Sequence, residues 1–188
     1  IVSATTAAQD VHRIQPRPSL IAKARRADLL VCTGADLESA WLPQLLRRAN
    51  NPGIRPGSAG YLEAASQVRL REIPPSIDRA DGDLHPQGNP HLHLDPRNLP
   101  PVANEMASRL AILDPKRAET YRRRADDFAA RWYQAVAEWE RRAQPLHGKG
   151  KIRQPIMARQ CFPDQAERAH IQIAARMRQP APLTQHRH

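Results

Sequence analysis

The stretch ADLLVCTGADLESAWLPQLLRRANN, residues 27–51, decides the fold. Near its start DLLVCTG at 28–34 is a continuous apolar run ending in glycine, which is typical of a buried strand. Cys32 lies inside this run and is expected to be a small core residue. LESAWLPQLLRRANN at 37–51 then has helical periodicity. Its apolar face consists of Leu37, Trp41, Leu45 and Leu46. A strand that leads into an amphipathic helix predicts a βα unit of a parallel sheet.

The segments before this unit have the same order of strand and helix. IVSAT at residues 1–5 is predicted to form a buried strand. LIAKARRA at 20–27 is predicted to form a short helix, with Ser19 as its N-cap. Two strand–helix pairs in succession favour βαβ units, and the predicted fold class is therefore α/β with a parallel sheet.

The segments after this unit are shorter and less regular. YLEAASQ at 61–67 is a candidate short helix, and VRLREIP at 68–74 is a candidate short strand. Residues 74–90 are a loop rich in Pro, Asp and Gly, and loops of this length inside a compact domain are often functional. NLPPVANEMASRLAIL at 98–113 is predicted to form another helix.

A long helix is predicted from a cap at Asp114 to about Gln144. About 30 residues at 1.5 Å each reach roughly 45 Å, so the helix needs a second lobe to lie against. Residues 145–188 form an atypical basic tail with no sustained strand pattern, expected to be poorly ordered. The predicted organisation is a lobe at 1–113, a linker helix at 114–144 and this tail. The apolar stripe of the helix is Tyr121, Ala125, Phe128, Trp132, Ala135 and Trp139.

The composition and the motifs of the chain argue against several functional classes. A net charge of +10 suggests nucleic-acid binding, but residues 151–188 hold seven Lys/Arg and two Asp/Glu and so carry half of it. No basic–aromatic stripe or DNA-binding motif accompanies that charge, so no nucleic-acid partner is expected and this function stays an alternative hypothesis. Nucleophile elbows, P-loops and H-E-x-x-H motifs are absent, which argues against an enzyme. No run approaches the ~18 apolar residues that a membrane span needs.

Two short segments share a form that is suited to metal binding. QDVH at 9–12 and GNPH at 88–91 each place a histidine after a polar, turn-forming run. Loops at the carboxyl ends of parallel strands meet at one edge of the sheet, so we expect His12 and His91 to come together. Neutral imidazole suits Zn²⁺, and it also suits Mn²⁺ when carboxylates are added.

The polar residues around these histidines are candidates for supporting roles at such a site. Asp10 and Asp95 are candidates for orienting an imidazole, although Asp95 before a helix is better explained as an N-cap. Asn89 is expected to be a turn residue first. His85 and His93 are expected to be solvated or to lie in the outer shell of a site.

The matching motifs resemble the zinc/manganese solute-binding proteins of bacterial ABC transporters, known as solute-binding family 9. The resemblance covers about residues 1–150, and its end is expected just after Gly150. It rests on SATTAAQDVHRIQPRPSLIAKARRADLLVCTGADLESAWLP, DGDLHPQGNPHLHLDPRN and the helix through WYQAVAEWERRAQPLHGKG. In that family the histidines of the D-P-H and N-P-H motifs are first-lobe metal ligands. They correspond to His12 and His91 here, with Val11 in place of the proline.

The resemblance implies a function and a partner. Family members have two lobes joined by a long helix, bind Zn²⁺ or Mn²⁺ as the transported ligand, and deliver it from the periplasm to a membrane permease. Some are described as adhesins, so a link to cell adhesion is implied as well. The first strand, the secretion signal and the second lobe are expected to be missing, with a truncated or frameshifted end after residue 150. A degenerate fragment without a transport role is therefore the other alternative.

Overall fold

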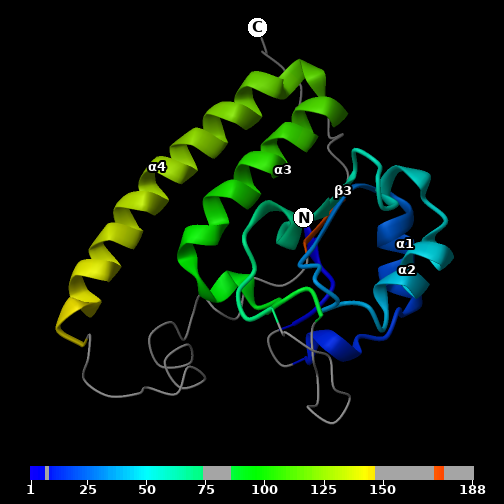
Figure 1. Ribbon diagram of the computed structural model, residues 1–188. Coiled ribbons are helices and arrows are strands. Elements are labelled where there is room, and N and C mark those ends of the chain that lie inside the picture. Colours follow the sequence, from blue (N-terminus) through cyan, green and yellow to red (C-terminus); the bar gives the residue numbers. More distant parts are fainter. Residues whose placement is uncertain (7–8, 74–85, 147–171, 176–188) are drawn as a thin grey trace, which may run out of the picture.

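A four-stranded sheet lies between two pairs of helices in the computed structural model, which describes residues 1–6, 9–73, 86–146 and 172–175 (Figure 1). This arrangement confirms the predicted α/β class with a long helix beside the lobe. The strands are β1 Val2–Ser3, β2 Ala27–Cys32, β3 Tyr61–Glu63 and β4 Gln172–Ala175. The α-helices are α1 Pro18–Arg25, α2 Leu42–Ala49, α3 Leu99–Leu113 and α4 Ala118–Ala143. Single 3₁₀ turns cover Val11–Arg13, Pro52–Ile54, Ala64–Gln67, Leu92–Leu94, Pro96–Asn98, Pro115–Arg117 and Gln144–Leu146.

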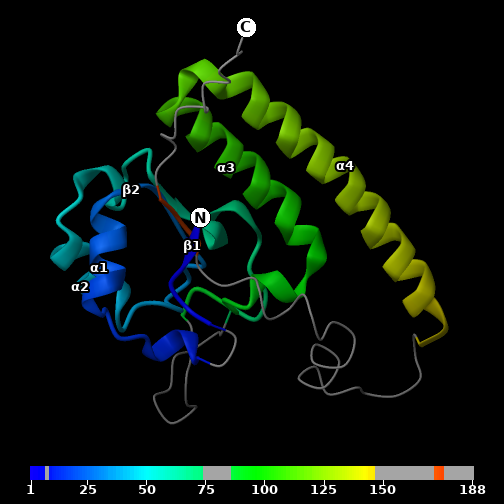
Figure 2. The ribbon, with the colours of Figure 1, turned by 180° about the vertical axis from the view of Figure 1, so that it is seen from behind.

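The sheet has the strand order β1-β4-β2-β3. β2 and β3 are parallel, with Leu30 opposite Tyr61. β4 is antiparallel to both of its neighbours, so β1 runs in the same direction as β2 and β3. The carboxyl ends of β1, β2 and β3 therefore meet at one edge of the sheet, as the sequence predicted. Figure 2 shows β1 and β2 from the opposite side.

The strand at 172–175 departs from the sequence prediction. We expected no strand pattern beyond residue 150, yet Gln172–Ala175 lies in the sheet and pairs with both β1 and β2. Because the segment is short and lies among basic and proline-rich residues, its periodicity gave no signal. The predicted disorder of the other residues beyond 146 lies outside the described residues.

The β2–α2 unit forms the centre of the core. Leu29 and Leu30 of β2 are 1% and 0% exposed, and Cys32 is buried beside them. Burial raises the pKa of the Cys32 thiol to about 12, so it is a protonated core residue, as predicted. Trp41 precedes α2 and is 2% exposed. The predicted apolar face of the 37–51 segment is confirmed, although its α-helix begins only at Leu42, with Pro43 in the first turn.

Three of the predicted elements differ from the structure. The first helix begins at Pro18 with Arg17 as its N-cap, because proline is favoured in a first turn, so Ser19 is not the cap. Residues 61–63 form β3 instead of a helix, since pairing with β2 overrides the helical propensity of an alanine-rich segment. Residues 68–73, the described part of the predicted strand at 68–74, form no strand.

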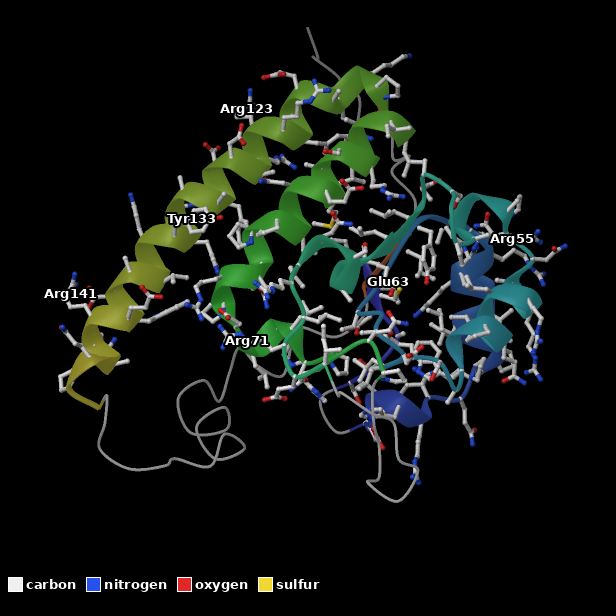
Figure 3. The ribbon with its side chains drawn as sticks, viewed as in Figure 1. Arg55, Glu63, Arg71, Arg123, Tyr133 and Arg141 are labelled. Atoms are coloured by element: carbon white, nitrogen blue, oxygen red, sulfur yellow. The ribbon has the colours of Figure 1, made fainter. Side chains whose placement is uncertain are left out.

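Helices α3 and α4 pack as an antiparallel pair against the β3 side of the lobe (Figure 1). The predicted stripe of α4 faces α3: Ala125 is buried, and Phe128 and Trp132 stack with ring centroids 5.3 Å apart. Tyr133 lies on the opposite face and is 52% exposed, with Arg123 and Arg141 on the same outer side (Figure 3). At about 1.5 Å per residue, 26 residues make α4 about 39 Å long. None of the helices in the described ranges is long and apolar enough to cross a membrane.

Candidate metal site

The first histidine loop is held by one carboxylate oxygen. Oδ1 of Asp10 accepts the backbone N–H of His12 at 3.0 Å, and it lies 2.8 Å from Nδ1 of the same imidazole. An ionised carboxylate can only accept, so Nδ1 carries the hydrogen and the lone pair of the neutral ring lies on Nε2. The hydrogen bond from His12 holds the pKa of Asp10 below its usual range. Asp10 therefore orients an imidazole, as the sequence predicted.

The second histidine loop uses the same device with an amide. Oδ1 of Asn89 accepts the backbone N–H of His91 at 2.9 Å and lies 2.9 Å from Nδ1 of that ring. An amide oxygen is also an acceptor, so the ring has its hydrogen on Nδ1 and its lone pair on Nε2. The sequence treated Asn89 as a turn residue and missed this role. The shared spacing of Asp-x-His and Asn-x-His was the signal that could have revealed it.

Different contacts attach the two loops to the lobe. The buried indole of Trp41 donates its Nε1–H to the carbonyl oxygen of Val11 at 2.8 Å, next to His12. In the second loop the backbone N–H of Asn89 donates to the carbonyl of Arg71 at 2.8 Å. Gly88 has a φ of +113°, and a Cβ atom there would approach Arg71 O and Leu70 Cβ to 2.9 Å. Only glycine fits this close approach without strain.

These loops bring the two predicted histidines together. The ring centroids of His12 and His91 are 6.2 Å apart. Two imidazoles that share one zinc ion through bonds of about 2.0–2.1 Å have centroids about 5–6 Å apart, which is close to the observed separation. Nε2 of His12 is buried, whereas His91 is exposed to solvent. The arrangement can hold a cation between two neutral imidazoles.

Further ligands are not assembled around this pair. The ring of His93 lies 6.1 Å from that of His91, on the 3₁₀ turn that follows it. Across the described ranges no three His, Cys, Asp or Glu side chains are gathered closely enough to hold a metal ion. His85 belongs to 74–85, outside the described residues, and so does most of the predicted 74–90 loop. Among the described residues, the pair thus supplies two candidate ligands.

Two carboxylates at the same sheet edge, Glu38 and Glu63, accept backbone N–H groups and form no metal-binding cluster with the histidine pair. Glu38, only 2% exposed, accepts the N–H groups of Thr33 and Gly34 at 2.9 and 3.0 Å. Burial raises the pKa of Glu38 above its usual value. Glu63 is the last residue of β3 and accepts the N–H of Ala35 at 3.2 Å (Figure 3). Both side chains fix the turn after β2, a role that sequence reasoning did not assign to them.

Asp95 does not orient a histidine. Its carboxylate makes two 2.8 Å hydrogen bonds with Arg97, and it caps the next turn by accepting the Arg97 N–H at 3.1 Å. The hydrogen bond from the Arg97 guanidinium holds the pKa of Asp95 below its usual range. Arg71 adds a longer ion pair at 3.6 Å, close to the start of α3 (Figure 3). The N-cap alternative for Asp95 is the one that the geometry favours.

A separate hollow in the lobe does not extend the site. It has a volume of about 630 Å³, and its lining includes Cys32, Tyr61 and Glu63. Neither His12 nor His91 contributes to that lining. Burial raises the pKa of Tyr61, which therefore stays protonated beside Cys32. The hollow adds no imidazole to the candidate metal site.

Residues 1–172 match the protein family described as zinc-uptake complex component A, periplasmic. The match continues past Gly150, where the resemblance was expected to end. The chain is also 28% identical over 129 residues to the iron-binding protein YfeA of Yersinia pestis. That alignment covers 69% of this chain and 37% of the relative, so the chain spans less than two fifths of the curated relative that it matches.

Proposed function

Because this chain belongs to the family of periplasmic zinc-uptake components, we propose that it binds a transition-metal ion as cargo for an ABC importer. The proposed location is the periplasm, and the proposed partner is the importer's membrane permease. The metal is carried unchanged, so no catalytic role is proposed. A cargo site differs from a catalytic metal site because protein ligands can close its shell.

The observation that carries this proposal is the pair of oriented imidazoles. His12 and His91 lie 6.2 Å apart, and each has its Nδ1–H engaged by an Asx side chain two residues earlier. A hydrogen bond of this kind at the distal nitrogen fixes the ring and directs the Nε2 lone pair toward a metal. We propose His12 and His91 as the first two ligands.

The proposed cargo is Zn²⁺, with Mn²⁺ second. Two neutral imidazoles favour Zn²⁺, whereas Mn²⁺ binds more readily where carboxylates are added. The iron-binding relative makes Fe²⁺ a further competitor. Affinity for nitrogen-rich sites generally rises from Mn²⁺ through Fe²⁺ to Zn²⁺, which predicts the same order here.

The remaining ligands of a full shell are proposed to come from outside the pair. Zinc in a closed shell takes four ligands, and two imidazoles supply half of them. Water, a second molecule of the chain or further protein residues can complete the coordination. Partial coordination predicts a weaker affinity than a complete protein shell would give.

Calorimetric titration of the metal-stripped chain with Zn²⁺ tests the proposal. We expect one saturable site that is lost in His12→Ala and in His91→Ala. His93→Ala tests whether the imidazole 6.1 Å from His91 completes the coordination, in which case the affinity falls without loss of the site. Competition with Mn²⁺ and Fe²⁺ then ranks the cargo.

The opposite result has a definite meaning. Zinc binding that is equally weak in the parent chain and in both histidine variants would reject metal capture by this chain. The alternative of a degenerate fragment without a transport role would then stand.

A further inference from the structure

A third residue continues the hydrogen-bond chain behind His91. Nδ2 of Asn89 donates to Oε2 of Glu72 at 2.7 Å, while Oδ1 of the same amide accepts from Nδ1 of His91 at 2.9 Å. Glu72, Asn89 and His91 thus form a continuous carboxylate–amide–imidazole chain. His12 has its carboxylate, Asp10, in direct contact at 2.8 Å. Both proposed ligands are therefore connected to a carboxylate, one directly and one through an amide.

The carboxylate determines which way the amide of Asn89 faces. An amide has a donor end and an acceptor end, and a flip exchanges them. If Asn89 flipped, its oxygen would face the Glu72 carboxylate at about the present 2.7 Å, which is repulsive. Its NH₂ group would then face both the backbone N–H and the ring of His91. A donor facing Nδ1 would move the ring hydrogen to Nε2, the nitrogen proposed to bind metal.

The backbone places Glu72 at this position by close approach of two segments. The Asn89 N–H bonds to the carbonyl of Arg71, and Gly88 leaves no space for a Cβ atom against Leu70. Glu72 itself has a left-handed φ of 55°, which turns the chain beside Asn89. Its side chain is exposed, so substitution leaves no buried cavity. Ala or Gln at this position keeps the Cβ atom and therefore the same backbone strain as Glu.

We propose that Glu72 is a positioning residue for metal capture, which holds the Asn89 amide so that His91 keeps its hydrogen on Nδ1 and its lone pair on Nε2. The inference rests on the proposed function. Glu72 acts through Asn89 and is not itself a ligand. A carboxylate can only accept, so Glu72 favours one orientation of the Asn89 amide, whereas a glutamine amide at this position can pair with either orientation.

The tautomer of His91 can be measured without any metal. Nitrogen-15 chemical shifts of the imidazole rings distinguish Nδ1–H from Nε2–H forms in the metal-free chain, at a pH about two units above the ordinary imidazole pKa. Among the eight histidines, the His91 signals are identified by their loss in His91→Ala. His12 is an internal control, because its carboxylate partner has no donor end to present.

Glu72→Ala is expected to lower the ratio of Nδ1–H to Nε2–H in His91 about three- to fivefold, with His12 unchanged. Glu72→Gln is expected to lower the ratio as well, because a glutamine amide can donate to a flipped Asn89 as readily as it accepts from the present orientation. Zinc affinity should fall about tenfold in Glu72→Ala, at the lower end of the effect of removing an outer-shell partner.

Three results would overturn the inference: an unchanged His91 ratio in Glu72→Ala, an equal change in His12, or a Gln variant that keeps the parent ratio. Zinc titration of the parent chain is run beside these spectra. If the parent binds no zinc, the proposed function fails, while the tautomer ratios still report independently on the Glu72–Asn89–His91 chain.

Discussion

The two histidine loops solve the same local problem with different chemistry. In both, one Asx oxygen accepts a backbone N–H and faces the ring Nδ1 of the histidine two residues later. Asp10 brings a negative charge to its ring directly, whereas Asn89 is neutral and has Glu72 behind it. His12 is 30% exposed, and a buried tryptophan fixes its loop, whereas His91 lies on the surface. One proposed ligand is therefore held by the core, and the other is exposed to solvent.

The two loops have the same local geometry, but different tertiary contacts hold them in place. The first loop depends on the core, because Val11 and Trp41 are both buried. The second loop depends on its contacts with the 70–72 segment and with α4. Trp132 of α4 donates its Nε1–H to the carbonyl of Pro96 at 2.7 Å, from a half-buried position. Each loop thus has a tryptophan anchor, and only the first lies in the core.

Removing the two tryptophans should have the largest and most unequal effects. Trp41→Ala deletes a side chain that is 2% exposed together with its bond to Val11, so we expect about 3–5 kcal/mol lower free energy of unfolding. Trp132→Ala removes a half-buried ring and should cost less. Urea denaturation of both variants measures the difference. Equal losses would contradict the view that only the first loop is anchored in the core.

Asp10→Asn makes the first loop resemble the second. The amide can still accept from His12, but the negative charge is lost, so we expect about tenfold weaker zinc binding with little change in stability. Calorimetry of the variant beside the parent chain tests this. An unchanged affinity would mean that the charge of the acceptor does not matter and that the loops are equivalent in this respect.

Asp95→Asn tests the carboxylate in the second loop that does not serve a histidine. The pKa of Asp95 is lowered chiefly by the hydrogen bond from Arg97, so its contribution is present above the unfolded-state pKa and is lost as pH falls through the folded-state pKa. We expect the variant to be less stable at neutral pH and equal to the parent chain at strongly acidic pH. Zinc affinity should change less than in Asp10→Asn. Thermal unfolding at a series of pH values provides the measurement.

Glu140→Gln should have the smallest effect. Glu140 of α4 reaches Arg97 at 3.9 Å, and both side chains are more than half exposed. Exposed ion pairs contribute about 0–1 kcal/mol and are screened by salt. We expect a difference that disappears in high salt, measured by urea denaturation at two ionic strengths. A large loss would show that α4 supports the second loop through charge as well as through Trp132.

The sequence predicted those parts of the fold in which local and tertiary preferences agree. The apolar run of β2, the amphipathic segment around Trp41 and the long stripe of α4 all have periodicities that packing reinforces. The helix prediction for residues 61–63 was wrong because Leu62 and Glu63 favour a helix locally, while pairing with β2 determines the structure. The four residues of β4 are too few to produce a pattern, and their partners lie far away in the sequence.

In the candidate site too, short motifs predicted some features, whereas others depend on tertiary contacts that the sequence did not reveal. The approach of His12 to His91 followed from similar motifs at the ends of parallel strands, and the role of Asp10 followed from its spacing. The similar role of Asn89 could have been predicted in the same way, because Asn89 also lies two residues before its histidine. Glu72 was not, since its contact with Asn89 depends on the close approach of two segments that no short motif encodes.

The position of β4 has a consequence for the order in which the lobe folds. Ile173 of β4 pairs with Val2 of β1 on one side and with Leu30 of β2 on the other, so the sheet joins segments that lie far apart in the chain. Ladders of such high contact order form slowly, because the entropy of closing a long loop is lost before the pairing compensates for it. The helical hairpin of α3 and α4 consists of two helices that are neighbours in the chain, so their mutual contacts close only a short loop. We therefore expect the hairpin of α3 and α4 to form before β1 pairs with β4.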